Sequence, residues 1–243
     1  MTVSFGWGPV AARVLAPAAA CVVVVDVLSF TTSVGVAVEG GTAVLPYRRR
    51  DATAAAYARE NDALLAVGRS EATQAHPWTL SPAALRAAPR PPRLVLPSPN
   101  GSTIAAESAS GGAAVVAASL RNRTAVARWL THRGYGTADR PLAVIASGER
   151  WPDGSLRPAL EDLLGAGAVL AALAGPHTPT PEATAAATLW SATEDPVAAL
   201  HGCDSGRELY EYGFPQDVAV AAETDSSTTV PVLVDGAFQE AAP

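Results

Sequence analysis

The sequence contains no lysine, so all 17 of its basic residues are arginine. Any anion that the protein binds must therefore be held by arginine, by backbone N–H groups or by a metal ion, and a lysine Schiff base is excluded. Acidic residues number 23, which gives a net charge of −6. This balance argues against a nucleic-acid partner, because a nucleic-acid-binding surface needs a basic face.

Cysteine and long apolar runs are also scarce. The two cysteines, Cys21 and Cys203, are each explained more simply as a small buried side chain than as half of a disulfide. No uninterrupted apolar run reaches the roughly 18 residues that a membrane span requires. Residues 1–9 carry no basic residue of the kind that opens a signal peptide. We therefore expect a cytoplasmic protein with no membrane partner.

Several common catalytic motifs are missing. No glycine-rich dinucleotide fingerprint follows a strand, and there is neither a Walker phosphate loop nor a nucleophile elbow. An aspartyl-phosphate phosphatase of the haloacid-dehalogenase type would carry a second aspartate two residues after Asp26, where this chain has Leu28. The chemistry must therefore come from other arrangements of carboxylates, hydroxyls and arginines.

The most informative segment that is present is residues 21–25, Cys-Val-Val-Val-Val, followed by Asp26. An apolar run without polar alternation predicts a strand that is buried on both faces, as in a parallel sheet under helices. Open α/β sheets bind their ligands at the carboxyl ends of such strands. Asp26 is therefore a candidate site residue, and a charge in that place is costly without a partner.

The rest of the chain alternates between predicted strands and helices. The predicted strands are 42–46, 63–67, 93–97, 115–118 and 141–146. The predicted helices are 31–39, 51–61, about 101–110, 124–133 and 158–173. This alternation predicts an α/β protein with a layered α/β/α arrangement and a largely parallel central sheet. We expect one domain over residues 1–243, with a possible lobe boundary in 68–92 or near 134–141.

The two ends of the chain are less regular. Residues 1–20 are expected to form an irregular lead-in with at most a short edge strand. After residue 180 we expect helices over 181–191, 196–201 and 205–212, and late strands over 217–221 and 230–234. The apolar composition, 49% hydrophobic residues, is compatible with a homodimer.

Polar residues follow three further predicted strands. Residues 98–103 resemble a phosphate-binding turn at a helix start, although a helix cap explains them equally well. The turns after 115–118 and 141–146 carry arginine and amide groups at the carboxyl ends of their strands. We therefore expect the polar residues of all three turns to lie beside Asp26. The candidate substrate-binding residues are Thr31, Thr32, Asn100, Ser102, Thr103, Arg121, Asn122 and Arg150.

Four carboxylates, Asp26, Glu149, Glu161 and Asp162, form the candidate metal site. Carboxylates at one sheet edge repel one another unless they are protonated or bridged by a cation, and Mg²⁺ prefers oxygen ligands of this kind. The alternative is that Glu161 and Asp162 only favour the positive end of their helix and that Glu149 is a solvated turn residue. On the metal hypothesis, Asp26 and Glu149 are also the catalytic candidates.

Four segments resemble the 2-phosphosulfolactate phosphatase family in the right order. They are Val25-Asp26-Val27-Leu28 with Thr31-Thr32, Ser98 to Thr103, Gly148-Glu149, and Glu161 to Gly167. The resemblance covers about residues 20–238. It implies a layered α/β/α fold and Mg²⁺-dependent hydrolysis of a phosphate monoester, with 2-phosphosulfolactate, a precursor of coenzyme M, as the named substrate.

Two positions depart from the family pattern. The family usually has an arginine directly after Asp-Val-Leu, where this chain has Ser29, and a Gly-Glu-Arg-like segment where residues 68–71 are Gly-Arg-Ser-Glu. Arginine forks are natural ligands for phosphate and sulfonate oxygens. The candidates to replace the missing arginine are Arg69, Arg121, Arg150 and Arg157. The alternative functions are a family relative with a different organic phosphate substrate and a noncatalytic protein that binds a small anion.

Overall fold

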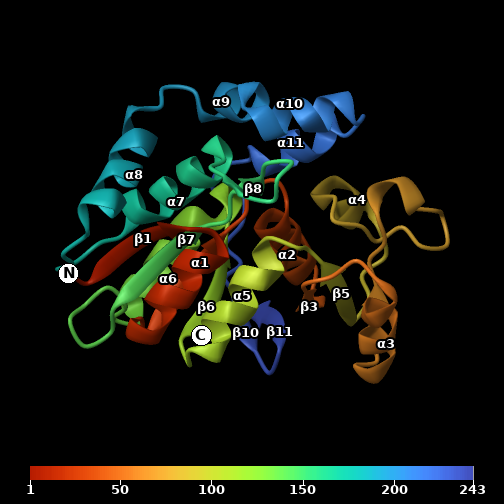
Figure 1. The fold of residues 1–243 in the computed structure, drawn as a ribbon, viewed down its shortest axis with the longest axis horizontal. Coiled ribbons are helices and arrows are strands. Elements are labelled where there is room, and N and C mark those ends of the chain that lie inside the picture. The colour runs from red at the N-terminus through yellow and green to blue at the C-terminus, as the bar shows by residue number, and fades with distance from the viewer. Residues whose placement is uncertain (243) are drawn as a thin grey trace.

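A nine-stranded sheet runs through the computed structural model, which describes residues 1–242 (Figure 1). Its strands are β1 (Val3–Trp7), β2 (Cys21–Val25), β3 (Ala43–Tyr47), β4 (Leu64–Leu65), β5 (Arg93–Pro97), β6 (Ala114–Ala118), β7 (Leu142–Ala146), β10 (Pro231–Val234) and β11 (Ala237–Glu240). A separate antiparallel ribbon pairs β8 (Glu149–Arg150) with β9 (Leu156–Arg157).

The strand order is β1-β7-β2-β6-β10-β11-β3-β5-β4. Two parallel sets, β1/β7/β2/β6 and β3/β5/β4, lie on either side of the hairpin β10–β11. The hairpin pairs antiparallel with β6 on one side and with β3 on the other. The predicted α/β class and the largely parallel sheet are thus confirmed, and the hairpin that joins its two halves is a feature the sequence pattern did not indicate.

Helices cover both faces of the sheet. Their bounds are α1 (Gly8–Leu15), α2 (Phe30–Glu39), α3 (Ala52–Glu60), α4 (Pro82–Ala87), α5 (Gly101–Ser110), α6 (Arg123–His132), α7 (Leu160–Ala172), α8 (Pro181–Ala192), α9 (Pro196–Gly202), α10 (Asp204–Glu211) and α11 (Pro215–Ala221). Helices α1, α2 and α5 share one core with the sheet, and α6, α7 and α8 share the other. Helices α9, α10 and α11 lie along the top of the view in Figure 1, above β8.

Strand β2 contributes to both cores, as its sequence predicts. Val22 and Val24 pack with α1, α2 and α5, whereas Val23 and Val25 pack with α6, α7 and α8. All four valines are fully buried. Because β2 also has a parallel neighbour on each side, β7 and β6, its carboxyl end lies well inside the sheet.

Two local predictions are wrong. Residues 217–221 belong to helix α11, where Pro215 takes the first turn and Asp217 places a carboxylate near the positive helix end. Residues 8–15 of the expected irregular lead-in form helix α1, which also has a proline in its first turn, after the predicted edge strand β1. Over residues 1–242, no helix combines the length and the apolar character needed to cross a membrane.

Candidate active site

The loop after β2 is fixed by hydroxyl groups that bind its own backbone. Thr31 Oγ1 accepts the N–H of Asp26 at 2.9 Å and donates to its carbonyl at 2.8 Å. Thr32 Oγ1 donates to the carbonyl of Val27 at 2.7 Å. Both threonines are buried. The structure therefore places these two predicted substrate contacts inside the loop, where they shape the start of α2, and not in a cavity.

Asp26 lies at the base of a cavity and is only 6% exposed. Its Oδ1 accepts the N–H of Phe30 at 2.9 Å. Its Oδ2 faces Gly101, where a Cβ atom would stand 2.7 Å from this oxygen and 2.3 Å from the Phe30 ring. Burial raises the pKa of Asp26 to about 6, although N–H groups and the neighbouring Ser147 hydroxyl oppose this shift. The close approach of α5 to β2 at this point requires glycine.

Asp162 joins the loops that follow β2 and β7. It lies in the first turn of α7, and its two oxygens accept the N–H groups of Val27 at 2.7 Å and Gly148 at 2.8 Å. The side chain is buried, and this burial, followed by the nearby charges of Asp26 and Glu161, holds its pKa well above the ordinary range. Asp162 is therefore a positioning residue, because each of its oxygens already binds the backbone.

Glu149 stands at the start of β8 and is partly buried beside the same cavity. Asn100 Nδ2 donates to its Oε2 at 3.0 Å. Burial first, and then the charges of Asp26 and Glu161, raise the pKa of Glu149 to about 8. The end of β5 and the end of β7 are thus brought together with the end of β2, even though β5 belongs to the other parallel set of the sheet.

Glu161 is buried one residue before Asp162 on α7. It lies against Cys203, and burial together with the Glu161 charge raises the pKa of that thiol to about 12. The thiol is also engaged with the backbone of Leu200 and Gly206. Cys203 is thus the small buried residue that the sequence predicts, without a disulfide.

The four predicted metal ligands are electrostatic neighbours, but they do not form a complete metal cage. Within residues 1–242, no group of three or more histidine, cysteine, aspartate or glutamate side chains has the geometry to hold a metal ion. Mg²⁺ usually binds one or two carboxylates and completes its shell with waters and substrate phosphate oxygens. Three carboxylates line the cavity, and one of them, Glu208, is paired with Arg157. The donor chemistry of the other two, Asp26 and Glu149, fits this mode.

We call the cavity at Asp26 the inner cavity. Its volume is about 360 Å³. Besides Asp26 and Glu149, its walls include the polar residues Ser29, Arg50, Arg69, Ser98, Asn100, Arg150, Ser205 and Glu208. Three arginines thus face the same space as three carboxylates, and they can offset the charge of a bound phosphate group.

Arg69 takes a fixed position in this wall. Its Nη2 donates to Ser29 Oγ at 2.9 Å and to the carbonyl of Leu80 at 3.2 Å. Its Nε pairs at 3.0 Å with Asp217, which is completely buried in α11. Arg69, one of the four candidates for the missing family arginine, therefore lies directly beside the serine that stands in its place.

Other predicted contacts lie outside the inner cavity. Arg121 pairs with Glu39 and with Glu223, each at 3.2 Å. The side chains of Asn122, Ser102 and Thr103 bind backbone groups. Arg157 pairs with Glu208. Of the eight predicted substrate-binding residues, only Asn100 and Arg150 line the inner cavity.

Sequence reasoning missed Asp217 as part of this site and did not select Arg50. Arg50 belongs to the run Arg48-Arg49-Arg50, for which the sequence offers two interpretations, an anion-binding patch and, more simply, a solvated turn. Asp217 contacts Arg69 across 148 positions of sequence, and no local pattern encodes such a pairing. The signal available for Arg69 was its position in the long connection 68–92, since long irregular connections are often functional.

Comparison with known proteins assigns the chain first to a class. A family profile that matches residues 12–236 describes phosphoric monoester hydrolases. The family is described as 2-phosphosulpholactate phosphatase, and the chain belongs to it. The chain is also similar to a probable 2-phosphosulfolactate phosphatase of Deinococcus radiodurans. The two are 31% identical over 223 residues, which cover 88% of this chain and 87% of the relative.

Proposed function

We propose that the chain is a Mg²⁺-dependent phosphatase that hydrolyses a small phosphorylated organic acid such as 2-phosphosulfolactate. The observation that carries this proposal is the pair of carboxylates, Asp26 and Glu149, that faces three arginines across the inner cavity. Burial raises the pKa of both carboxyl groups, the charge of Glu161 adds to the shift at both, and the charge of Asp26 adds to it at Glu149. A cation at this place is therefore favourable.

Asp26 and Glu149 would hold the metal ion. When bound, Mg²⁺ supplies Lewis-acid polarisation of a phosphoryl oxygen and activation of water. The chain itself supplies position and charge. Arg50, Arg69 and Arg150 neutralise the phosphate and the acid groups of the substrate, and positioning of this kind accounts for much of the rate in phosphoryl transfer.

Two residues keep this arrangement in place. Asn100 binds Glu149 and fixes the direction of its carboxylate. Asp162 holds Val27 and Gly148, and so sets the distance between the loop that carries Asp26 and the loop that carries Glu149. Neither residue needs to contact the substrate for its loss to lower the rate.

Phosphate release tests the proposal. A panel of phosphorylated hydroxy acids that includes 2-phosphosulfolactate is assayed with Mg²⁺ and with a chelator, using the wild type, Asp26→Asn and the control Glu182→Gln, an exposed carboxylate on α8. We expect Mg²⁺-dependent release that the control retains and Asp26→Asn loses by about a thousandfold or more. No metal-dependent release from any ester would favour the noncatalytic anion-binding alternative, and full activity of Asp26→Asn would refute this placement of the site.

Rapid acid quenching during turnover separates two roles of Asp26. Phosphate that remains covalently attached to the Asp26 carboxyl group would show that this side chain is the nucleophile. Release of phosphate without any phosphorylated protein would show that water attacks the phosphorus directly.

A further inference from the structure

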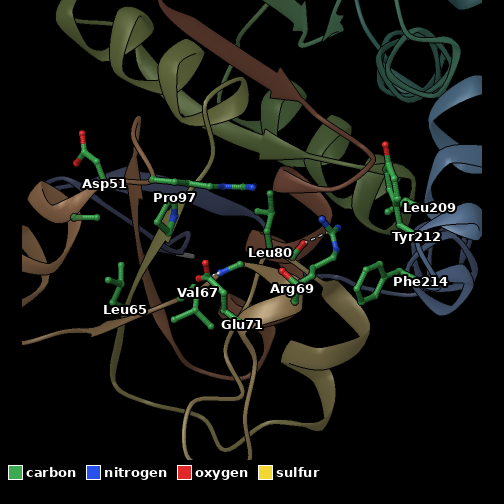
Figure 2. A pocket seen from close by; sticks show the side chains of 15 residues that line it. Asp51, Leu65, Val67, Arg69, Glu71, Leu80, Pro97, Leu209, Tyr212 and Phe214 are labelled. Carbon is green, nitrogen blue, oxygen red and sulfur yellow. Dashed lines mark hydrogen bonds between the residues drawn. The ribbon is translucent and has the colours of Figure 1, made fainter.

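Figure 2 shows a second cavity, which shares lining residues with the inner cavity. Its volume is about 680 Å³, against about 360 Å³ at Asp26. We call it the outer cavity. The residues that line both cavities are Arg50, Arg69, Leu80, Leu209 and Tyr212. A molecule bound at Asp26 can therefore extend past these residues into the outer cavity.

The outer cavity has the lining of a site for an organic group. Figure 2 shows Leu65, Val67 and Pro97 on one side of it and Leu209 and Phe214 on the other. Pockets that enclose drug-sized ligands have volumes of roughly 300–1,000 Å³ and walls that are mostly apolar with a few polar groups. A three-carbon acid with its phosphate is much smaller than such a ligand, and the outer cavity adds room that it would leave unfilled.

Two of the five residues at the boundary between the cavities are arginines. Arg69 is anchored by Asp217 and Ser29. Arg50 is exposed and makes no hydrogen bond or ion pair with any residue in 1–242. Partial desolvation by the surrounding residues and then the charge of Arg69 lower its pKa, and the charges of Glu71 and Glu149 oppose this shift. Glu71, which also lines the outer cavity, and Glu149 act on Arg50 through their charges without forming an ion pair with it. The two guanidinium groups at this boundary therefore attract an anion, and each offers a planar fork to carboxylate or sulfonate oxygens.

We propose that the outer cavity binds the organic part of a phosphate ester that is larger than a three-carbon acid. The phosphate occupies the inner cavity at Asp26, an acid group of the substrate lies between Arg50 and Arg69, and an apolar chain or ring contacts Val67 and Phe214. This assignment rests on the proposed phosphatase function and specifies the class of its substrate.

The test compares 2-phosphooxy carboxylic acids whose side chain grows from methyl to butyl to phenylethyl. We expect kcat/KM of the wild type to rise about tenfold or more along the series, because each added group removes apolar surface from water. Val67→Phe and Ser70→Trp each fill part of the outer cavity. Both should flatten this rise, measured within each protein as the ratio of kcat/KM for the phenylethyl compound to that for the methyl compound, whereas the control Val197→Phe, on the exposed surface of α9, should keep it.

A binding measurement keeps this inference separate from the activity. Calorimetry with non-hydrolysable phosphonates that carry the same side chains reports on the outer cavity even where no ester releases phosphate. Tighter binding of the longer compounds, lost in both filled variants, supports the inference whatever the outcome of the phosphatase assay. Equal affinity along the series in the wild type, or an unchanged preference in both Val67→Phe and Ser70→Trp, would overturn it.

Discussion

The inner base and the outer rim of the site are built in different ways. At the base, Asp26 and Asp162 are buried and their carboxylates accept backbone N–H groups, and Gly101 packs closely against Asp26. At the rim, Arg50 and Tyr212 are exposed and come from connections at the edges of the elements. The base is therefore set by the fold itself, whereas the rim can change without disturbing the sheet.

This difference between base and rim indicates which part of the site carries the chemistry and which part selects the substrate. Loops that carry binding residues on a rigid scaffold can vary while the scaffold is retained. In this chain Ser29 stands where the family pattern has an arginine, and Arg69, from a connection some 40 positions away, binds that serine. We infer that the base supplies the phosphatase chemistry and that the rim selects the organic part of the substrate.

After the loss of Asp26 itself, the largest effect is expected for Asp162→Ala, which acts on the base without touching the substrate. It leaves two buried N–H groups without acceptors, at a cost of about 1–3 kcal/mol each. We expect the melting temperature to fall by roughly 5–15 °C and kcat to fall by about a hundredfold. Asp162→Asn, which keeps one acceptor, should lie between Ala and the wild type. Wild-type kcat in Asp162→Ala would contradict the positioning role.

A somewhat smaller effect is expected for Gly101→Ala. The added methyl group would meet the Phe30 ring at 2.3 Å and Asp26 at 2.7 Å, so α5 must move away from β2. Overpacking of this kind costs about 1–3 kcal/mol, and thermal unfolding should show it together with a lower kcat. The matched control is Gly202→Ala, because a Cβ there meets no atom within 4 Å. Equal stability of the two variants would argue against the tight contact at Asp26.

The rim is tested by comparing two arginines that sequence alone treats as equivalent. Arg69→Lys loses the fork that binds Ser29 and Asp217, so KM should rise about tenfold with a smaller change in kcat. Arg121→Lys alters a pairing with Glu39 and Glu223 outside the inner cavity, so both constants should stay within about twofold. The test is steady-state kinetics of both variants on one substrate. A larger rise in KM for Arg121→Lys than for Arg69→Lys would contradict the placement of Arg69 at the site and of Arg121 outside it.

The smallest expected effect is a dependence of stability on pH. The pKa of Glu149 rises from its ordinary value of 4.5 to about 8 on folding, so the folded state binds more protons between these values. Its contribution to stability is thus fully present below about pH 4.5 and is lost as the pH rises through 8. Melting temperatures are measured with a chelator present. Between pH 5.5 and 8.5, the melting temperature of the wild type should fall by a few degrees more than that of Glu149→Gln. Parallel curves for the two proteins would contradict this.

The sequence predicts the base of the site better than its rim, and the reason is physical. The run of valines in β2 predicts burial on both faces, and the structure shows it. Asp26 is recognisable from the local sequence because it directly follows this run. The pairing of Arg69 with Asp217 depends on how distant segments pack. Residues 217–221 are Asp-Val-Ala-Val-Ala, a short apolar run that periodicity alone does not assign to a strand or a helix. Pro215 in the first turn and the burial of Val218 and Val220 accompany a helix in the structure.

The hydroxyl-rich segments show a second limit of local patterns. Thr31, Thr32 and Thr103 stand at helix starts, where substrate binding and backbone support predict the same residue types. In the structure their hydroxyls bind backbone oxygens of the chain itself. Only the three-dimensional arrangement distinguishes them from Asn100, which reaches the inner cavity and binds Glu149.

The central claim is that Asp26 and Glu149 form a cation site at the base of the inner cavity. Calorimetric titration of the wild type and Asp26→Asn with Mg²⁺, in two buffers of different ionisation enthalpy at pH 7, tests it most directly. We predict that the wild type binds Mg²⁺ and releases protons, because carboxyl groups with raised pKa values must ionise to hold the metal. Asp26→Asn should lose both the binding and the proton release. Equal Mg²⁺ binding by the two proteins would contradict the account.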